Sequence, residues 1–320
     1  MTVPEAPVGG SRASATAGAA AVPDALVIGR VLISRVEEST FAVLDPFEVY
    51  PELTQVLLEA NMSWLAPRFF DPVAQRLNLA FQGFVVRSAD ALIVVDTCVG
   101  DCKARRRVSF DQQRWGWLER LKAAGVEPTA VTHVVCTHFH VDHVGGNTRL
   151  ENGRWVPSFP NARYLFPRAE FDYWSSEAGA RAMERTGDYF ADSVLPVVRA
   201  GQADLVEGDH ALTAQVGLRP APGHTPGGVV VDVQSDGARA LLLGDVLHTL
   251  LQIRYPAWST RFCTDPDASR RTRLDILRRA ADRDVWLLPN HFPAPSAGRL
   301  ERWRDGYNWR FAGAARPVFV

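Results

Sequence analysis

Thr137-His138-Phe139-His140-Val141-Asp142-His143 places four residues able to bind a metal within six positions. The stretch follows the apolar, β-branched run Val131-Thr132-His133-Val134-Val135-Cys136, which predicts a strand. Because alternate side chains of a strand point to opposite faces, the loop at its end can direct His138 and His140 to one point and Asp142 and His143 to a second. The sequence therefore predicts two adjacent divalent metal ions. Zinc is the default expectation for this ligand set, with iron or manganese as alternatives.

The pattern His-x-His-x-Asp-His after a strand resembles the signature of the metallo-β-lactamase-fold hydrolases. That family has three further ligands downstream, and ligand-type residues stand at all three matching places in this sequence. The resemblance implies one metal held by three histidines, a second held by an aspartate and two histidines, and one bridging aspartate: His138, His140 and His224; Asp142, His143 and His291; and Asp245. A chance cluster of histidines is the alternative, but five of the eight histidines of the chain occupy expected ligand positions.

The fold class follows from the same resemblance, which covers roughly residues 80–293. It implies an α+β, four-layer αβ/βα sandwich, in which two mixed β-sheets are flanked by helices. Every expected ligand follows an apolar strand, and strand ends at one edge of a two-sheet core form a rigid platform for a site. The metals are therefore expected at that open edge.

Composition restricts the function further. The ligands extend from position 138 to position 291 and must converge, so residues 25–320 are expected to form a single catalytic domain. The net charge of −1 provides no basic field for a nucleic acid or an anionic membrane. Four cysteines are too few for a disulfide scaffold in 320 residues. No apolar run approaches the ~20 residues of a membrane span and no signal peptide is evident, so we expect a soluble, cytoplasmic protein.

The first quarter of the chain has three expected parts. Residues 1–24 are rich in Ala, Gly, Ser and Pro and predict a flexible tail. Residues 25–36 predict one strand, or two with a bend at Gly29. Residues 37–78 are interrupted by prolines and are expected to form an inserted lid, whose Trp64, Phe69 and Phe70 would line a substrate pocket. The alternative is that these aromatic residues only pack the insertion onto the sheet.

Most remaining elements are predicted by periodicity. Residues 79–87 and 91–97 predict a hairpin, and Asp96 at its end resembles the family's acidic residue that supports the metal loop without binding metal. Helices are expected at about 112–124, with Asp111 as the cap, and at 168–186 and 270–282. Strands are expected at 162–166, 214–221, 229–233, 240–243 and 285–288.

Two metals about 3.5–4 Å apart can share a hydroxide and polarise a carbonyl or phosphoryl oxygen. We therefore expect cleavage of a lactone or carboxylic ester of a small molecule, with Asp142 binding metal and relaying a proton. His248 stands where the family's acyl-homoserine lactonases typically have a Tyr that contacts the substrate. This departure resembles the broader lactonase and organophosphate-hydrolase-like relatives, and it leaves His248 as either a catalytic residue or a pocket wall.

Other functions remain as alternatives. The same metal site serves phosphotriester, thioester and β-lactam hydrolysis. Di-iron proteins of this fold are oxidoreductases, but they use a flavin domain that this sequence lacks. A non-catalytic metal-binding protein is disfavoured, because such relatives commonly lose ligands and this chain keeps all seven. We expect uncharged, moderately hydrophobic substrates, no nucleic-acid or membrane partner, and a chain compatible with a homodimer.

Overall fold

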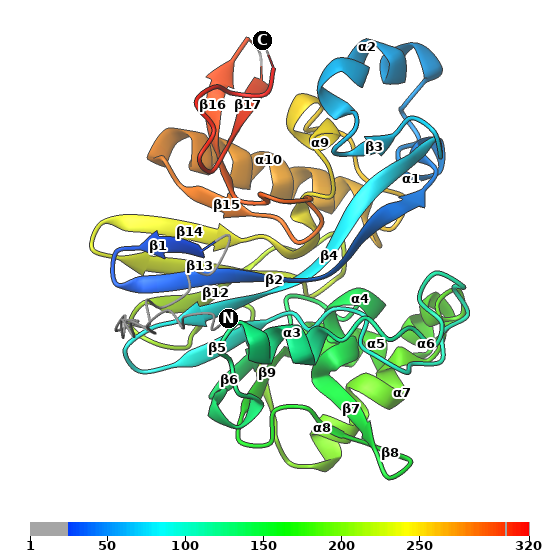
Figure 1. Cartoon of the computed structure of the whole chain (residues 1–320), viewed down its shortest axis with the longest axis vertical. Helices are drawn as coiled ribbons and strands as arrows, with labels where there is room; N and C mark the ends of the chain where they lie inside the picture. The colour runs from blue at the N-terminus through cyan, green and yellow to red at the C-terminus, as the bar shows by residue number, and fades with distance from the viewer. Residues whose placement is uncertain (1–24, 305, 320) are drawn as a thin grey trace, which may run out of the picture.

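The computed structural model describes residues 25–304 and 306–319, so the tail expected at residues 1–24 lies outside the described residues. Two large sheets and one small hairpin make up the β-structure (Figure 1). The first sheet has the order β1-β2-β4-β5-β6-β9-β10, with β3 paired to β4, and the second runs in sequence from β11 to β17. Both sheets are mixed, because β5-β6-β9-β10 and β14-β15 are parallel while the other neighbours are antiparallel.

The strands have the following bounds: β1 Ala25–Ile28, β2 Val31–Leu44, β3 Phe70–Asp71, β4 Arg76–Arg87, β5 Leu92–Val95, β6 His133–Val135, β7 Thr148–Glu151, β8 Arg154–Pro157, β9 Arg163–Pro167, β10 Ala203–Val206, β11 His210–Ala211, β12 Val216–Pro220, β13 Val229–Ser235, β14 Ala238–Leu242, β15 Trp286–Leu288, β16 Gly298–Trp303 and β17 Gly306–Phe311. The α-helices are α1 Pro46–Val49, α2 Gln55–Leu65, α3 Trp117–Ala123, α4 Val141–Val144, α5 Arg168–Trp174, α6 Glu177–Met183, α7 Tyr189–Ser193, α8 Leu195–Arg199, α9 Leu251–Arg254 and α10 Pro266–Arg283. Short 3₁₀ turns are η1 Pro128–Ala130, η2 Gly145–Asn147 and η3 Gly244–Val246.

The two sheets pack face to face, and helices cover their outer faces. In β5, Ile93 and Val95 belong to the apolar cluster shared by both sheets, whereas Val94 belongs to the cluster beneath α3 and α5–α8. In β14, Leu242 faces the first sheet and Leu241 faces α9 and α10. This two-residue alternation buries both faces of each sheet. Figure 1 shows α10 and α3 on opposite outer sides, which confirms the predicted four-layer αβ/βα sandwich.

Two helix predictions were wrong in their bounds. The helix expected from about residue 112 begins only at Trp117, and Asp111 does not cap it, because its carboxylate accepts the Arg105 N–H at 2.7 Å. Asp101 instead accepts the backbone N–H groups of Trp115 and Gly116, immediately before the helix. The helix expected at residues 168–186 is broken into α5 and α6, with a new N-cap between them.

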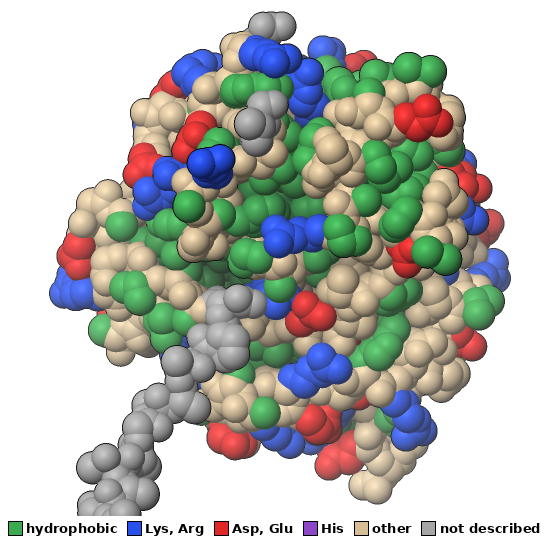
Figure 2. All heavy atoms as spheres, turned by 45° about the horizontal axis from the view of Figure 1, so that its top comes forward, with side chains coloured by type: hydrophobic (Ala, Val, Ile, Leu, Met, Phe, Trp, Pro, Cys, Tyr) green, Lys and Arg blue, Asp and Glu red, His purple; other side chains and the backbone are tan. Residues whose placement is uncertain are grey.

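Residues 37–78 lengthen the first sheet and then cross to the second. β2 and β4 pair antiparallel from Leu32↔Arg87 to Leu44↔Leu77, and Figure 1 shows both strands extending toward α1 and α2. Phe69 and Phe70 are fully buried in the cluster that includes the outer face of the second sheet. Trp64 packs edge-on against Phe319, with 4.7 Å between ring centroids. The side of α2 is turned forward in Figure 2, where hydrophobic side chains run across the middle of the face and charged ones lie mostly around it.

None of the helices within residues 25–304 and 306–319 has the length and apolar character that a membrane span requires.

Candidate metal centre

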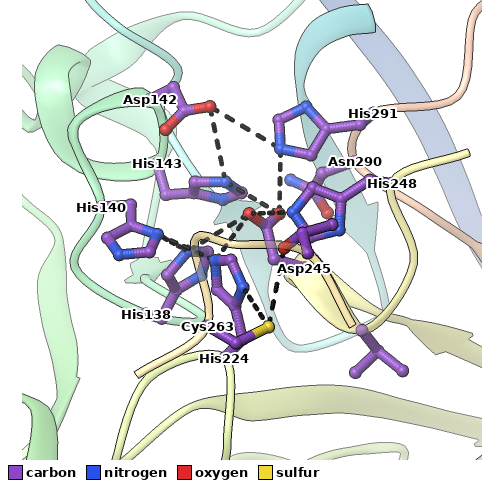
Figure 3. A network of polar contacts seen from close by, with 12 residues as sticks. His138, His140, Asp142, His143, His224, Asp245, His248, Cys263, Asn290 and His291 are labelled. Atoms are coloured by element: carbon purple, nitrogen blue, oxygen red, sulfur yellow. Dashed lines mark hydrogen bonds and ion pairs between the residues drawn. The ribbon is translucent and has the colours of Figure 1, made fainter. Parts of the chain in front are cut away.

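All seven predicted ligands meet at one edge of the sandwich (Figure 3). Each comes from a segment that directly follows a strand or from the short turn after it. His138 and His140 precede α4, which carries Asp142 and His143. The other three ligands follow β12, β14 and β15 of the second sheet: His224, Asp245 and His291. Both sheets therefore contribute ligands to a single site, as the sequence predicted from strand ends.

Three imidazoles form the first half of the site. His140 Nδ1 lies 3.1 Å from His138 Nε2 and 2.8 Å from His224 Nε2, so three ring nitrogens point to one place. Burial lowers the pKa of both His138 and His140, and the neighbouring imidazoles lower it further. Neutral imidazole is the form that binds a metal ion. Burial also disfavours the charged form of His224, but the charge of Asp245 raises the pKa of this imidazole to about 10, so His224 would lose a proton on binding a metal ion.

The second half combines one aspartate with two imidazoles. His291 Nε2 lies 3.6 Å from Asp142 Oδ2, and His143 Nε2 lies 4.0 Å from the same oxygen. The three residues form a group whose candidate ligand atoms all lie within 4.8 Å of one another. Carboxylate and imidazole together suit zinc and harder divalent ions.

Asp245 lies between the two halves and presents one oxygen to each. Its Oδ2 is 3.0 Å from His224 Nε2 and 3.6 Å from His138 Nε2, whereas its Oδ1 is 3.1 Å from His143 Nε2 and 3.0 Å from His291 Nε2. Asp245 therefore lies where the carboxylate expected to bridge two metal ions would lie.

Two atoms of the centre test whether metal ions fit. His143 Nε2 and Asp245 Oδ1 are buried and have no hydrogen-bond partner among the described residues, although they face one another. A buried polar atom without a partner is costly in free energy and rare in native proteins. Both atoms are directed into the centre, where a cation would satisfy them. The residues present therefore fit two divalent ions.

Asp96 orients the second half of the site without facing it. This fully buried carboxylate accepts hydrogen bonds from His143 Nδ1 at 2.9 Å, Asn290 Nδ2 at 2.9 Å and the Thr137 backbone N–H at 2.7 Å. Since a carboxylate only accepts, His143 must donate from Nδ1 and leave Nε2 free for a metal. The geometry agrees with the supporting role that the family resemblance implied for Asp96.

The glycines after the motif seat α4 on the turn that follows β5. The Gly145 N–H donates to Cys98 O at 2.8 Å, and a Cβ at Gly145 would lie 1.6 Å from Val99 O. No other residue fits such a close backbone approach. Buried Glu38 accepts the Val99 and Gly100 N–H groups at 3.0 Å each, so it fixes the turn from the other side.

Glu170 is a buried residue that the sequence analysis missed. Its carboxylate accepts the Phe139 N–H at 2.9 Å, the Gly227 N–H at 2.8 Å and the Trp174 Nε1–H at 2.7 Å. Burial raises its pKa, and these hydrogen bonds oppose the rise. It joins the loop of His138 and His140 to the loop of His224. The only signal in the sequence was one acidic residue in a helix, which is ordinarily a solvated position.

Comparison with known proteins gives this geometry a family. The sequence model of the metallo-beta-lactamase superfamily matches residues 83–290. The chain belongs to this superfamily. It is 28% identical over 123 residues to an N-acyl homoserine lactonase of Bacillus sp, covering 38% of this chain and 41% of that relative. It is 30% identical over 141 residues to the N-acyl homoserine lactonase AttM of Rhizobium radiobacter, covering 42% and 48%. The chain thus spans less than half the length of these relatives.

Solved structures of the superfamily show the same fold over most of the chain. The hydrolase AbOPH superposes with a TM-score of 0.76 at 21% identity, covering 91% of this chain and 98% of that one. The dizinc quorum-quenching lactonase AidC, in complex with a product, gives a TM-score of 0.74 at 20% identity with the same coverage. The metallo-beta-lactamase fold predicted from the metal motif is confirmed.

His248 extends the superfamily's metal centre by one imidazole. Its Nε2 lies 3.2 Å from Asp245 Oδ2, and its ring stacks on His291 with 5.3 Å between centroids. Neither ring nitrogen has a hydrogen-bond partner among the described residues. The same imidazole borders the cavity beside the centre.

A cavity of about 550 Å³ opens over the candidate metal centre. Its apolar lining includes Val43, Leu44, Phe81, Phe110, Tyr173 and Trp174. The predicted pocket residues Trp64, Phe69 and Phe70 do not line it, and this prediction was wrong. Phe69 and Phe70 are instead buried in the core, where Phe69 packs edge-on against Phe292. The segment 37–78 still reaches the cavity, but through the end of β2 and through α1.

Proposed function

We propose that this chain is a dinuclear, zinc-dependent hydrolase that opens a lactone or cleaves a carboxylic ester of a small molecule. The observation that carries the proposal is the position of Asp245, whose two carboxylate oxygens face two separate groups of metal-ligand type. The names of the sequence relatives, N-acyl homoserine lactonases, support the substrate class. The cavity volume suits a small molecule.

When bound, two divalent ions supply a water of lowered pKa and a fixed positive charge that polarises the carbonyl oxygen. The chain's own residues do the rest. Asp142 Oδ2 borders the cavity and is the acceptor placed to take the proton of an attacking water and return it to the leaving oxygen. His248 borders the cavity beside Asp245 and is placed to hold the substrate oxygen by a hydrogen bond.

The apolar lining selects and positions the acyl part of the substrate. Phe81 packs edge-on against His291, with 5.6 Å between centroids, so the apolar surface begins at the metal centre itself. A hydrophobic chain held there excludes bulk water from the reacting carbonyl, which strengthens the electrostatic interactions inside the site.

A substrate panel tests the proposal. Zinc-loaded protein is assayed by pH-stat against γ- and δ-lactones, aryl esters, phosphotriesters, thioesters and β-lactams. We expect lactones or esters to give the highest kcat/KM, with activity lost to a chelator and restored by zinc. Faster cleavage of another class, or oxygen-dependent turnover by iron-loaded protein, would overturn the proposal.

A further inference from the structure

The mouth of the cavity carries arginines that the apolar pocket expected from the sequence does not explain. Arg107 and Arg185 both line it. Arg107 is half-buried, and Arg185 is exposed. Burial lowers the pKa of Arg107, the charge of Asp142 opposes this shift, and the charge of Arg185 adds to it. Both arginines border the same cavity.

Hydrogen bonds join the two segments that carry these arginines. The Arg106 N–H donates to Thr186 O at 3.0 Å, and the Arg106 side chain donates to Glu184 O at 2.8 Å. Gly187 has φ +103, and a Cβ there would lie 3.3 Å from Arg106 N. The adjacent residues Arg107 and Arg185 therefore lie on neighbouring segments, and both line the cavity.

Neither arginine has an acidic partner. Within residues 25–304 and 306–319, no carboxylate oxygen lies within 4.0 Å of the guanidinium group of Arg107 or of Arg185. Arg107 donates only to the neutral Ser109 Oγ at 3.1 Å. In contrast, Arg181 on the same rim pairs with Glu177 at 3.6 Å. Guanidinium groups that line a cavity and form no ion pair within 4.0 Å among the described residues can bind an anionic group of a ligand.

Two aromatic rings connect this arginine pair to the metal centre. The Arg107 guanidinium lies over the Phe110 ring at 5.0 Å, Phe110 packs edge-on against Phe81 at 5.2 Å, and Phe81 packs against His291 at 5.6 Å. A ligand along this wall would meet the metals at one end, an apolar surface in the middle and positive charge at the other end.

We propose that Arg107 and Arg185 form an anion subsite that selects lactones or esters carrying a carboxylate at the far end of the acyl chain. The proposal rests on the hydrolase function proposed above and replaces the expectation of uncharged substrates. A guanidinium pair binds a carboxylate through charge-assisted, directed hydrogen bonds, and the aromatic wall accommodates the methylene chain between carboxylate and carbonyl.

Two esters of equal chain length test the subsite: the p-nitrophenyl monoester of adipic acid and p-nitrophenyl hexanoate. They differ in the terminal carboxylate. With zinc-loaded protein we expect kcat/KM to favour the charged ester. Arg107→Gln and Arg185→Gln should each lower the charged-to-neutral ratio of kcat/KM about 10-fold, the value of a charged hydrogen bond, mainly through KM.

Arg181→Gln is the matched control, because it removes the same charge one helical turn earlier on the same rim. Its guanidinium is already paired, so the ratio should change less than about 2-fold, as for an exposed ion pair. Equal effects of Arg181→Gln, Arg107→Gln and Arg185→Gln would mean that all positive charges of the rim attract the carboxylate alike. This result would overturn the subsite.

Binding measured by calorimetry separates the subsite from the hydrolase function. The probes are N-butyl adipamic acid and neutral N-butylhexanamide. If the neutral ester is hydrolysed but neither arginine variant changes the charged-to-neutral ratio or acid binding, the subsite is overturned and the proposed function stands. If no lactone or ester of the panel is hydrolysed while Arg107→Gln weakens binding of the acid about 10-fold, the subsite stands and the proposed function is overturned.

Discussion

The metal centre and the mouth of the cavity are built in opposite ways. At the centre, ligands are mostly buried, follow strands of two sheets, and are held by carboxylates such as Asp96 and Glu170 that accept several hydrogen bonds each. At the mouth, Arg185 and Arg261 are exposed and lie in turns. Under the proposed function, this difference assigns the chemistry to the rigid edge of the sandwich and the discrimination among substrates to the mouth.

The largest expected effect is at the centre. Asp142→Asn keeps the size of the side chain but removes a negative charge and a proton acceptor. Turnover should fall by roughly 10²-fold or more, given the 10²–10⁴-fold value of acid–base assistance. The measurement is kcat on the best ester, with metal content determined on the same sample. Unchanged kcat at unchanged metal content would show that Asp142 has no part in proton transfer.

A smaller effect is expected one layer behind the ligands. Asp96→Asn replaces an acceptor of four hydrogen bonds with a group that has only one accepting oxygen, so His143 loses its orientation. Metal affinity should weaken about 10–100-fold, measured by competition with a chromogenic chelator. Asp232→Asn is the control, because Asp232 is also buried but pairs with Arg239 in the second sheet. If both variants weakened metal binding equally, general destabilisation would be the cause.

Variants of two phenylalanines distinguish a residue that lines the cavity from one that packs in the core. Phe110→Ala should raise KM for p-nitrophenyl hexanoate, with little change in kcat. Each loss of about 1.4 kcal/mol of binding free energy raises KM about 10-fold. Phe70→Ala should leave KM unchanged but lower the free energy of unfolding by roughly 3–5 kcal/mol, the usual cost of truncating a buried phenylalanine. Urea denaturation and steady-state kinetics measure the two effects. A change in KM for Phe70→Ala would indicate that this residue contacts the substrate after all.

The smallest effect on catalysis is expected from Lys103, which anchors the loop leading to Arg107. Burial lowers the pKa of this fully buried lysine to about 7, against the opposing charge of Asp192. A folded-state pKa below the unfolded value means that stability falls as pH drops toward 7 and rises between about 7 and 10.5. Lys103→Met removes this dependence. The free energy of unfolding of the wild type, minus that of the variant, should therefore rise by about 2–3 kcal/mol from pH 6 to pH 9. A constant difference would contradict the lowered pKa.

The centre could be predicted from the sequence because metal chemistry tolerates few residue types and each ligand follows an apolar strand. His224, Asp245 and His291 stand far apart in the chain, yet each follows an apolar strand that the sequence predicts. Asp96 was recognisable for the same reason. The strand pattern and the residue types able to bind a metal select the same positions, so the sequence alone was enough to name these residues.

The mouth could not be predicted, because its residues meet only through tertiary contacts. Nothing local distinguishes Arg107 from its neighbours Arg105 and Arg106, but Arg105 pairs with Asp192 at 2.6 Å while Arg107 reaches the cavity. Phe70 looked like pocket lining because it follows prolines in a long insertion, and the paired β2 and β4 instead carry that segment onto the core. The β16–β17 hairpin was also missed, since charged and aromatic residues alternate in it without an apolar run.

Metal content per chain tests the central claim most directly. Protein purified without chelators and dialysed against metal-free buffer is analysed by inductively coupled plasma mass spectrometry, with protein concentration from amino-acid analysis. The account expects close to two divalent ions per chain, mainly zinc, and graded chelation should remove the ion of the Asp142 half before that of the three-histidine half. One ion or fewer per chain, from folded protein after reloading with zinc, would contradict it.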